Sequence, residues 1–220
     1  MSKILNKSKE VFIQNKFRII ILFLLILISQ SCKRTEIQYY SNGKIKQEIN
    51  FKGEKKNGIC TWYYENGNKQ FEFNYKNGML EGVSKRWNYD GIIQFEDNYK
   101  DGFKHGTSKA FDEGGKLISL SNYIKDTLEG IYQEFYTSNQ QIKIQGKYSH
   151  GAMDSLWAFF DEYGRQIGEG IFKNGNGSIK SFYSNGKIKQ EQKYLNNIAV
   201  DRLIEYDTEG KTIQGEININ

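Results

Sequence analysis

The sequence predicts an all-β protein: an elongated single sheet of tandem antiparallel β-hairpins, preceded by an N-terminal signal helix. Three observations predict this fold. The chain has 22 glycines and no proline, so positive-φ turns are available and no residue interrupts a ladder of strands. Tyr and Phe are abundant, with 15 and 14 copies, and aromatic residues favour strands. The third observation is a repeat of about 24 residues that runs through most of the chain.

The N-terminal segment is the first expected element. Residues 19–28 (IIILFLLILI) form an unbroken apolar run after a basic stretch. Ten helical residues span only ~15 Å, about half of a ~30 Å hydrocarbon core, so the run favours a signal peptide over a membrane span. Residues 1–31 hold five basic side chains and one acidic one, which leaves 26 basic and 25 acidic residues in the remainder. The remainder therefore gives no reason to expect a nucleic-acid partner.

The segment Ser29-Gln30-Ser31-Cys32 follows the apolar run and resembles the lipobox of bacterial lipoprotein signals, although Ser29 stands where Leu is usual. The resemblance implies that residues 1–31 are a signal peptide and that Cys32 is lipidated as the mature N-terminus. Residues 32–37 are then a short linker, and the protein is a membrane-anchored lipoprotein of the bacterial envelope, on the periplasmic or outer-membrane side. An uncleaved anchor and a soluble protein are the alternatives. Cys60 falls in a predicted strand and is expected to be a free, buried thiol.

The repeat has a register that glycine marks. Successive marks are 24 residues apart, with one spacing of 25 and one of 22. The marks are Gly43, Gly67, Gly91, Gly115, Gln140, Gly164, Gly186 and Gly210. An aromatic residue stands four positions before each mark and eight positions after the first seven marks. These fixed positions predict a domain over residues 38–220, made of about eight units.

Each unit predicts a hairpin, as the unit around Gly67 illustrates. Asn66-Gly67 suits a tight turn, and Phe71, Phe73 and Tyr75 then alternate with polar residues as in a strand. Asn77-Gly78 predicts a second turn. A further glycine follows in five units, at Gly58, Gly82, Gly106, Gly130 and Gly177. About sixteen strands at ~4.8 Å would give a sheet roughly 75 Å long, with an aromatic ladder stabilising one face.

The stretches Tyr75–Trp87 and Tyr99–Gly106 resemble MORN repeats, whose hallmark is aromatic-x-x-Gly-x-x-x-Gly. The extra Tyr-x-Asn-Gly turn is similar to the bacterial MORN-variant subfamily, which includes antitoxin-like proteins. The resemblance covers residues 38–217 and weakens at Gln140 and at Asp154-Ser155. It assigns structural roles to Tyr63, Gly67, Tyr75, Gly78, Gly82, Trp87, Gly91, Tyr99, Gly102 and Gly106. The end of the chain also resembles the YD hairpin repeats of secreted proteins.

Candidate catalytic and metal-binding residues are few. His105 and His150 each precede a turn glycine and have no second ligand at metal spacing, so we expect solvated turn residues. Glu81 and Glu129 stand where other units have Asn or His, which indicates a polar turn position. Asp112-Glu113 and Asp161-Glu162 also fall in predicted turns. We therefore expect no enzyme activity, no cofactor and no metal; an envelope hydrolase using Asp112, Asp161 and Glu162 is the competing hypothesis.

The aromatic ladder is expected to be the core of the fold, because every unit carries it. Trp62, Trp157 and Phe159 lie outside its period, and alternation puts Trp62 and Phe159 on the opposite face from the neighbouring ladder residues. These three residues are the candidate binding surface. We expect a non-enzymatic, membrane-tethered repeat module that holds an unidentified protein or glycan partner. The alternative is an antitoxin or immunity protein that neutralises a toxin.

Overall fold

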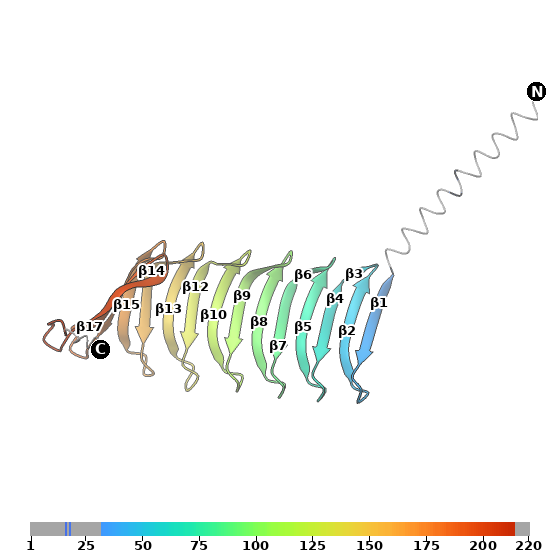
Figure 1. The fold of residues 1–220 in the computed structure, drawn as a ribbon, viewed down its shortest axis with the longest axis horizontal. Helices are drawn as coiled ribbons and strands as arrows, with labels where there is room; N and C mark the ends of the chain where they lie inside the picture. The colour runs from blue at the N-terminus through green and yellow to red at the C-terminus, as the bar shows by residue number, and fades with distance from the viewer. Residues whose placement is uncertain (1–15, 17, 19–31, 214–220) are drawn as a thin grey trace, which may run out of the picture.

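A computed structural model describes Lys16, Arg18 and residues 32–213. Apart from Lys16 and Arg18, the predicted signal helix lies outside the described residues. The described chain forms a single elongated sheet (Figure 1). Its strands are β1 (Lys33–Tyr39), β2 (Ile45–Lys52), β3 (Lys55–Lys56), β4 (Gly58–Tyr63), β5 (Lys69–Lys76), β6 (Met79–Leu80), β7 (Gly82–Trp87), β8 (Ile93–Lys100), β9 (Phe103–Phe111), β10 (Leu117–Ile124), β11 (Thr127–Leu128), β12 (Gly130–Phe135), β13 (Ile142–Ser149), β14 (Ala152–Phe160), β15 (Gln166–Lys173), β16 (Asn176–Phe182), β17 (Ile188–Leu195) and β18 (Ile198–Glu205).

All strand pairs are antiparallel, and each strand pairs with its neighbours along the chain. The two-residue strands β3, β6 and β11 pair with the same strands as β4, β7 and β12, which follow them. The predicted open sheet of tandem hairpins is therefore confirmed. The segment expected to be a linker, 32–37, differs: β1 begins at Lys33, directly after Cys32.

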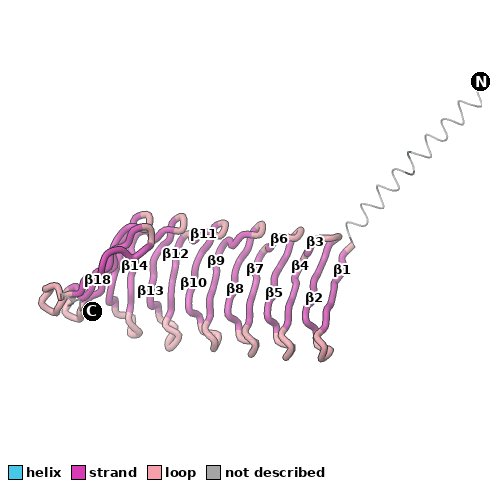
Figure 2. Tube along the Cα trace, in the orientation of Figure 1, coloured by secondary structure: helices cyan, strands magenta, loops and turns pink. Residues whose placement is uncertain are grey.

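The register-mark turns that join β1 to β2, β4 to β5, β7 to β8 and β9 to β10 lie along one long side of the sheet, at the bottom of Figure 2. In the turn at Gly67, the Gly67 N–H donates to the Tyr64 carbonyl at 2.9 Å, and the Tyr64 N–H donates to the Asn68 carbonyl at 2.8 Å. Gly67 has a φ of 96°, whereas Asn66 has no positive φ. The turn is thus longer than a two-residue loop and needs one left-handed residue. Gln140 supplies it in the fifth unit with a φ of 60°.

The second turns lie along the opposite edge and need two left-handed residues. Asn77 and Gly78 have φ values of 53° and 87°, as in a type I′ turn. The Gly78 N–H donates to the Lys56 carbonyl of the preceding unit at 2.8 Å, and the Gly102 N–H repeats this bond to Leu80 at 2.9 Å. The turns themselves therefore continue the hydrogen-bond ladder from one unit to the next.

A two-residue register shift separates the second turn from the strand that follows it. Across β5, Tyr75 pairs with Leu80 but Phe71 pairs with Arg86, so two residues, Glu81-Gly82, are extra. The predicted glycine at this position therefore marks a bulge. The β15–β16 pair has no such shift, because the unit with the 22-residue spacing lacks these two residues.

This difference corrects the alignment of Gly177 with the bulge glycines. Gly177 pairs with Phe172 in a continuous ladder and has no positive φ, so it is not a bulge residue. Glycine is needed here for a different reason: no side chain fits, because an added Cβ would lie 2.0 Å from the Ile171 carbonyl oxygen. In the fifth unit Ser155 takes the bulge position with a φ of 60°, without glycine.

The N-terminal units carry an asparagine one position before the second ladder aromatic, a feature that the sequence analysis missed. The Asn98 side chain donates to the Thr107 carbonyl at 2.7 Å, and Asn122 donates to the Ile131 carbonyl at 2.8 Å. Asn50 makes the same contact with Ile59 at 2.5 Å. Each acceptor directly follows a bulge glycine, so the asparagine satisfies a carbonyl that the bulge removes from the regular ladder. Asn recurring at 24-residue spacing was the available signal.

The tightest packing lies near the C-terminal end of the sheet. Trp157, 4% exposed, is buried with Met153 and Phe172, and Tyr132, Tyr148 and other half-buried residues pack against them. From β15 onward the strands turn out of the plane of the preceding array (Figure 1). Glycines in β13 and β15 leave space for the rings of Trp157 and Phe172.

Candidate functional site

The aromatic ladder occupies both faces of the sheet. Phe71, Phe73 and Tyr75 of β5 share one face, here called the aromatic face. Tyr63 points to the other face, where its hydroxyl donates to Glu48 at 3.0 Å. The expectation of a ladder on one face was therefore wrong, because residues before and after a turn share a face only if the pairing register places them so.

The three predicted binding residues belong to the aromatic face and to its packing. Trp62 pairs with Phe71 and lies with its ring centroid 5.6 Å from that of Phe73. Trp157 is buried in the C-terminal cluster, and Phe159 packs against that cluster. Trp157 is thus a core residue, which contradicts its place in a binding surface. Trp62 and Phe159 do lie on the face opposite Tyr63 and Phe160, as predicted. That face, however, already carries the ladder aromatics that follow the register marks, such as Tyr75.

One row of residues runs across the middle of the aromatic face, here called the central row. Its members pair from strand to strand: Cys60 with Phe73, Ser84 with Asp97, Asp97 with Ser108, Ser108 with Ser121, Tyr132 with Gly146, Trp157 with Gly170, and Gly170 with Ile179. Large and small residues alternate at both ends of the row. At its centre, four consecutive members are small or polar: Ser84, Asp97, Ser108 and Ser121.

A hollow of about 320 Å³ opens on the aromatic face beside this polar segment. It is lined by Phe71, Phe73, Ser84, Lys85, Arg86, Phe95, Asp97, Tyr99 and Lys104. Asp97 accepts hydrogen bonds from the Lys104 ammonium at 2.9 Å and from the Ser108 hydroxyl at 2.5 Å. Although burial alone would lower the pKa of Lys104, the hydrogen bond and charge of Asp97 raise it above its ordinary value. The half-buried carboxylate of Asp97 is therefore paired with a cation of the protein itself, Lys104.

A second hollow, of about 520 Å³, lies near the register-mark turns of the C-terminal units. Asp161, Arg165 and Tyr183 are among its lining residues. Its charged groups already bind each other, since the Arg165 guanidinium donates to Asp161 at 2.8 Å. The Tyr183 hydroxyl donates to the Tyr206 carbonyl at 2.7 Å. The Asp161–Arg165 pair thus stabilises a single turn, and the Tyr183 hydroxyl links one turn to the next.

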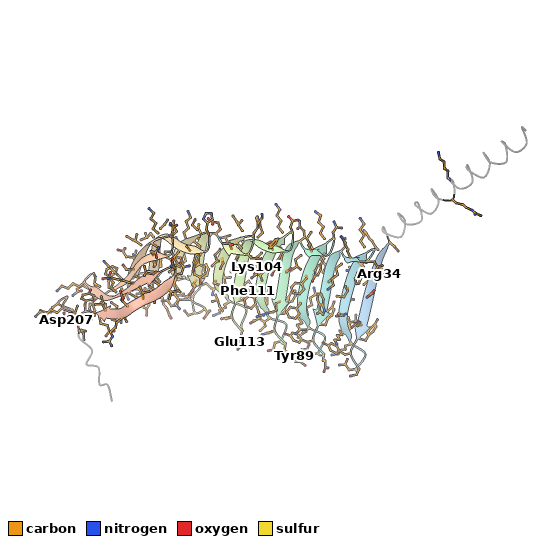
Figure 3. All side chains as sticks on the ribbon, turned by 45° about the horizontal axis from the view of Figure 1, so that its top comes forward. Arg34, Tyr89, Lys104, Phe111, Glu113 and Asp207 are labelled. Atoms are coloured by element: carbon orange, nitrogen blue, oxygen red, sulfur yellow. The ribbon has the colours of Figure 1, made fainter. Side chains whose placement is uncertain are left out.

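The carboxylates considered for catalysis stabilise turns. Glu81 accepts the Asp101 N–H at 3.0 Å, and Glu129 accepts the His150 N–H at 2.8 Å. One oxygen of Asp112 accepts the N–H groups of Gly114 and Lys116, at 3.0 and 2.8 Å, and Asp161 makes the equivalent bonds in its own turn. The predicted turn role of these residues agrees with these contacts. Glu113 and Glu162 are exposed at the same edge, where Figure 3 labels Glu113.

The histidines and cysteines form no cluster with other potential ligands. Among the described residues, no group of three or more His, Cys, Asp or Glu side chains is placed to hold a metal ion. His150 is exposed in a second turn, as expected. His105 is instead half-buried within β9, next to the bulge glycine Gly106, so the expectation of a solvated turn residue was wrong for it. Cys60 is fully buried and unpaired, as expected, and burial raises the pKa of its thiol. Cys32 is exposed and unpaired. No helix within the described part of the chain is long and apolar enough to span a membrane.

A comparison with family models matches five segments of the chain to the MORN repeat variant: residues 35–52, 56–77, 80–101, 104–125 and 175–196. Each matched segment contains one register-mark turn with its two flanking strands. A comparison with curated proteins gives no match. MORN repeats suggest a module for protein or membrane interaction, and the family is generally non-catalytic. The five matched hairpins are thus similar to MORN repeat variants.

Proposed function

We propose that the chain is a non-enzymatic repeat module of the bacterial envelope, tethered by lipid at Cys32, that holds a protein partner along its sheet. The observation that carries this proposal is the placement of an exposed cysteine directly before the first strand. A lipid at Cys32 would hold the edge strand β1 within one residue of the membrane. The exposed Lys33 would then lie near the headgroups, which suits an anionic surface.

Exposed apolar side chains favour a protein partner. The residues that directly follow the bulge positions lie on the face opposite the aromatic face. Among them, Ile59 and Ile131 follow a glycine and Leu156 follows Ser155, and they are 52%, 56% and 57% exposed. Regularly spaced apolar residues on an open sheet face suit contact with another protein surface. The charged side chains of that face bind each other, as in the pairs of Glu96 with Lys109 and with Lys85. The aliphatic residues therefore remain available for contact.

The intact mass of the protein extracted from membranes tests the tether, with the Cys32→Ala variant as control. We expect a mature chain that begins at Cys32 and is heavier by its acyl groups, and an unprocessed chain from the variant. An unmodified mass for both proteins would contradict the lipid anchor. That result would favour the alternative of a cytoplasmic antitoxin, for which rescue from a neighbouring toxic gene by co-expression is the test.

A further inference from the structure

The polar centre of the aromatic face contains a hydroxyl group without a hydrogen-bond partner. Ser84 is 4% exposed, lines the hollow, and its Oγ atom is buried with no partner among the described residues. A buried hydroxyl without a partner is unfavourable, because it loses its hydrogen bonds to water and gains none in the protein. Alanine or valine at this position would avoid that cost. Packing alone therefore does not explain the serine at this position, where, as at Trp157 Nε1 and Ser181 Oγ, a buried polar atom has no partner among the described residues.

The hollow also presents a cation that has no anionic partner. The Arg86 guanidinium lies 4.1 Å from the centroid of the Phe95 ring, and the described residues place no carboxylate within ion-pair distance of it. Arg86 is exposed at the rim. Lys85 and Lys104, the other cations of the lining, are paired with Glu96 and Asp97. The free charge of the hollow is therefore positive.

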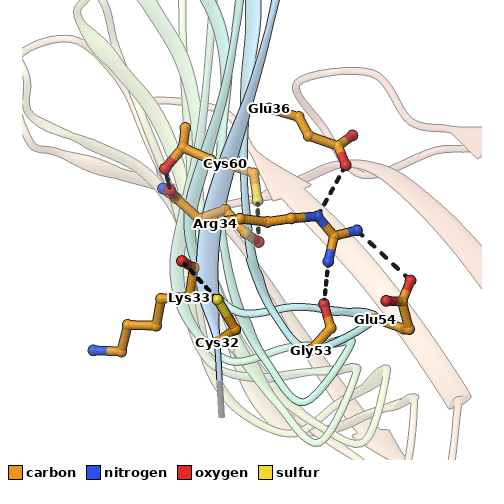
Figure 4. Close-up of polar contacts among 9 residues, drawn as sticks. Cys32, Lys33, Arg34, Glu36, Gly53, Glu54 and Cys60 are labelled. Atoms are coloured by element: carbon orange, nitrogen blue, oxygen red, sulfur yellow. Dashed lines mark hydrogen bonds and ion pairs between the residues drawn. The ribbon is translucent and has the colours of Figure 1, made fainter. Parts of the chain in front are cut away.

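Arg34, at a different position of the repeat, shows how a similarly stacked arginine is paired with carboxylates. Its guanidinium lies 4.4 Å from the centroid of the Phe51 ring, on the same face of the sheet. In contrast to Arg86, it is paired with Glu36 at 3.1 Å and with Glu54 at 3.6 Å (Figure 4). Arg165, which lies 5.4 Å from the centroid of the Tyr163 ring, is likewise paired, with Asp161 at 2.8 Å. Of these three stacked arginines, Arg86 is the one without a carboxylate among the described residues.

We propose that this hollow receives one aromatic side chain of a protein partner, with a neighbouring carboxylate of the partner bound by Arg86. Phe71, Phe73 and Phe95 contact the ring, and the Ser84 hydroxyl bonds a polar atom of the bound segment. The proposal rests on the proposed function and specifies the chemistry of the partner. A guanidinium binds a carboxylate through two parallel hydrogen bonds, and aromatic rings pack edge-to-face against one another.

The size and openness of the hollow favour a protein segment over a sugar or a cofactor. Its ~320 Å³ volume lies at the lower end of the range of ligand pockets, about 300–1,000 Å³, which suits one side chain. The hollow opens onto an extended sheet, so the rest of a partner chain has a surface to follow. A sugar would need several free polar groups, whereas one oxygen of Asp97 is already bound by Lys104 and Ser108.

Short peptides provide the test, with the full chain in detergent micelles and binding followed by NMR shifts of assigned amides. The probe is acetyl-Phe-Glu-amide; acetyl-Phe-Gln-amide lacks the charge, acetyl-Ala-Glu-amide lacks the ring, and glucuronate is the acidic-sugar probe. We expect the first peptide to shift the amides of Ser84, Arg86 and Phe95. Each of the other two peptides should bind at least about tenfold more weakly, the loss expected for one charge-assisted contact or one buried ring.

Two variants and a matched control sharpen the test. Arg86→Gln should weaken acetyl-Phe-Glu-amide at least about tenfold and leave acetyl-Phe-Gln-amide unchanged. Arg34→Gln removes the arginine that already has its carboxylates, so it should change neither affinity. Ser84→Leu fills the hollow and should abolish the shifts. Thermal unfolding of each variant verifies that it is folded.

Several results would overturn the proposal. They are equal binding of the Glu and Gln peptides, binding that survives Arg86→Gln, and shifts caused by glucuronate without shifts caused by the peptide. Absence of any shift at the highest soluble peptide concentration also overturns it. These results leave the mass measurement on Cys32 unaffected, so failure of the hollow and failure of the proposed tether are distinguishable.

Discussion

Strands β7–β10 and strands β12–β15 occupy equivalent positions in successive repeats but fill the aromatic face differently. In β7–β10 the central row holds Ser84, Asp97, Ser108 and Ser121, beside an open hollow. In β12–β15 it alternates Tyr132, Gly146, Trp157 and Gly170, and the face is closed by the buried cluster. The family model matches residues 56–77, 80–101 and 104–125 but not 126–174. The better-matched region is thus the one with the more open interior.

The difference shows that the backbone conformation of the repeat and the packing of its side chains are determined by different residues. Gln140 and Ser155 take the left-handed conformations that glycine takes elsewhere, so the hairpins of the unmatched region keep the same turns. The interior depends on the volume that facing residues share across the strands. An added Cβ at Gly146 would lie 2.1 Å from Trp157, so the tryptophan occupies the space that a side chain on β13 would need.

Truncation of Trp157 should have the largest effect on stability. We expect Trp157→Ala to lower the free energy of unfolding by about 4 kcal/mol, because it removes a buried aromatic ring and leaves a cavity. Trp157→Phe should lower it by less, because the buried indole N–H has no hydrogen-bond partner among the described residues. Urea unfolding measures both variants. Ser84→Ala, at the equivalent position of β7, is the control and should be neutral or stabilising. A loss under 1 kcal/mol for Trp157→Ala would contradict the assignment of this cluster as the main core.

Adding a methyl group beneath Trp157 should have the next largest effect on the free energy of unfolding. Gly146→Ala should lower the free energy of unfolding by about 2 kcal/mol, since the new methyl group overlaps the indole ring. Gly114→Ala is the control, because Gly114 lies in a turn without a positive φ and an added Cβ there meets its nearest atom at 3.4 Å. Thermal unfolding compares the two. Similar losses for both variants would show that Gly146 does not serve to accommodate Trp157.

The asparagine ladder distinguishes the N-terminal units from the C-terminal ones. We expect Asn98→Ala and Asn122→Ala each to lower the free energy of unfolding by about 1 kcal/mol, because each leaves a bulge carbonyl without its hydrogen bond. Lys147→Ala replaces the residue at the equivalent position of the fifth unit, which makes no such bond, and should change stability little. Hydrogen exchange at Gly106 and Gly130 should rise in the asparagine variants alone. If the lysine variant is equally destabilised, the ladder has no special role.

The smallest expected effect on stability concerns Glu96, on the face opposite the aromatic face. The hydrogen bond from Lys109 holds the pKa of Glu96 below its ordinary value, with Lys85 adding a second attraction. The stability from this pair is present above the unfolded-state pKa and is lost as pH falls through the lowered folded-state pKa. Glu96→Gln should therefore cost under about 1 kcal/mol at neutral pH and nothing in acid. Thermal unfolding across pH measures the difference, and a difference that persists in acid would refute the assignment.

Much of the fold was predictable because the signals are local. Asn77-Gly78 predicts a type I′ turn from its own residues, and the alternation of Phe71, Phe73 and Tyr75 predicts a strand from theirs. The bulge was harder to predict from the sequence. Gly82 does lie at a bulge, but Gly177, aligned with it, does not, because a two-residue deletion changes the strand pairing without changing the glycine pattern.

The all-β class, the period and the turns of the hairpins follow from the amino-acid sequence alone, since individual residues select left-handed conformations. The folded sheet was needed to show which side chains share a face and which residues are neighbours across strands. It placed Trp157 inside the core, and it brought Ser84 and Asp97 together beside the unpaired Arg86. These relations depend on the summed register of successive hairpins, and a shift of one residue in any of them would exchange the two faces.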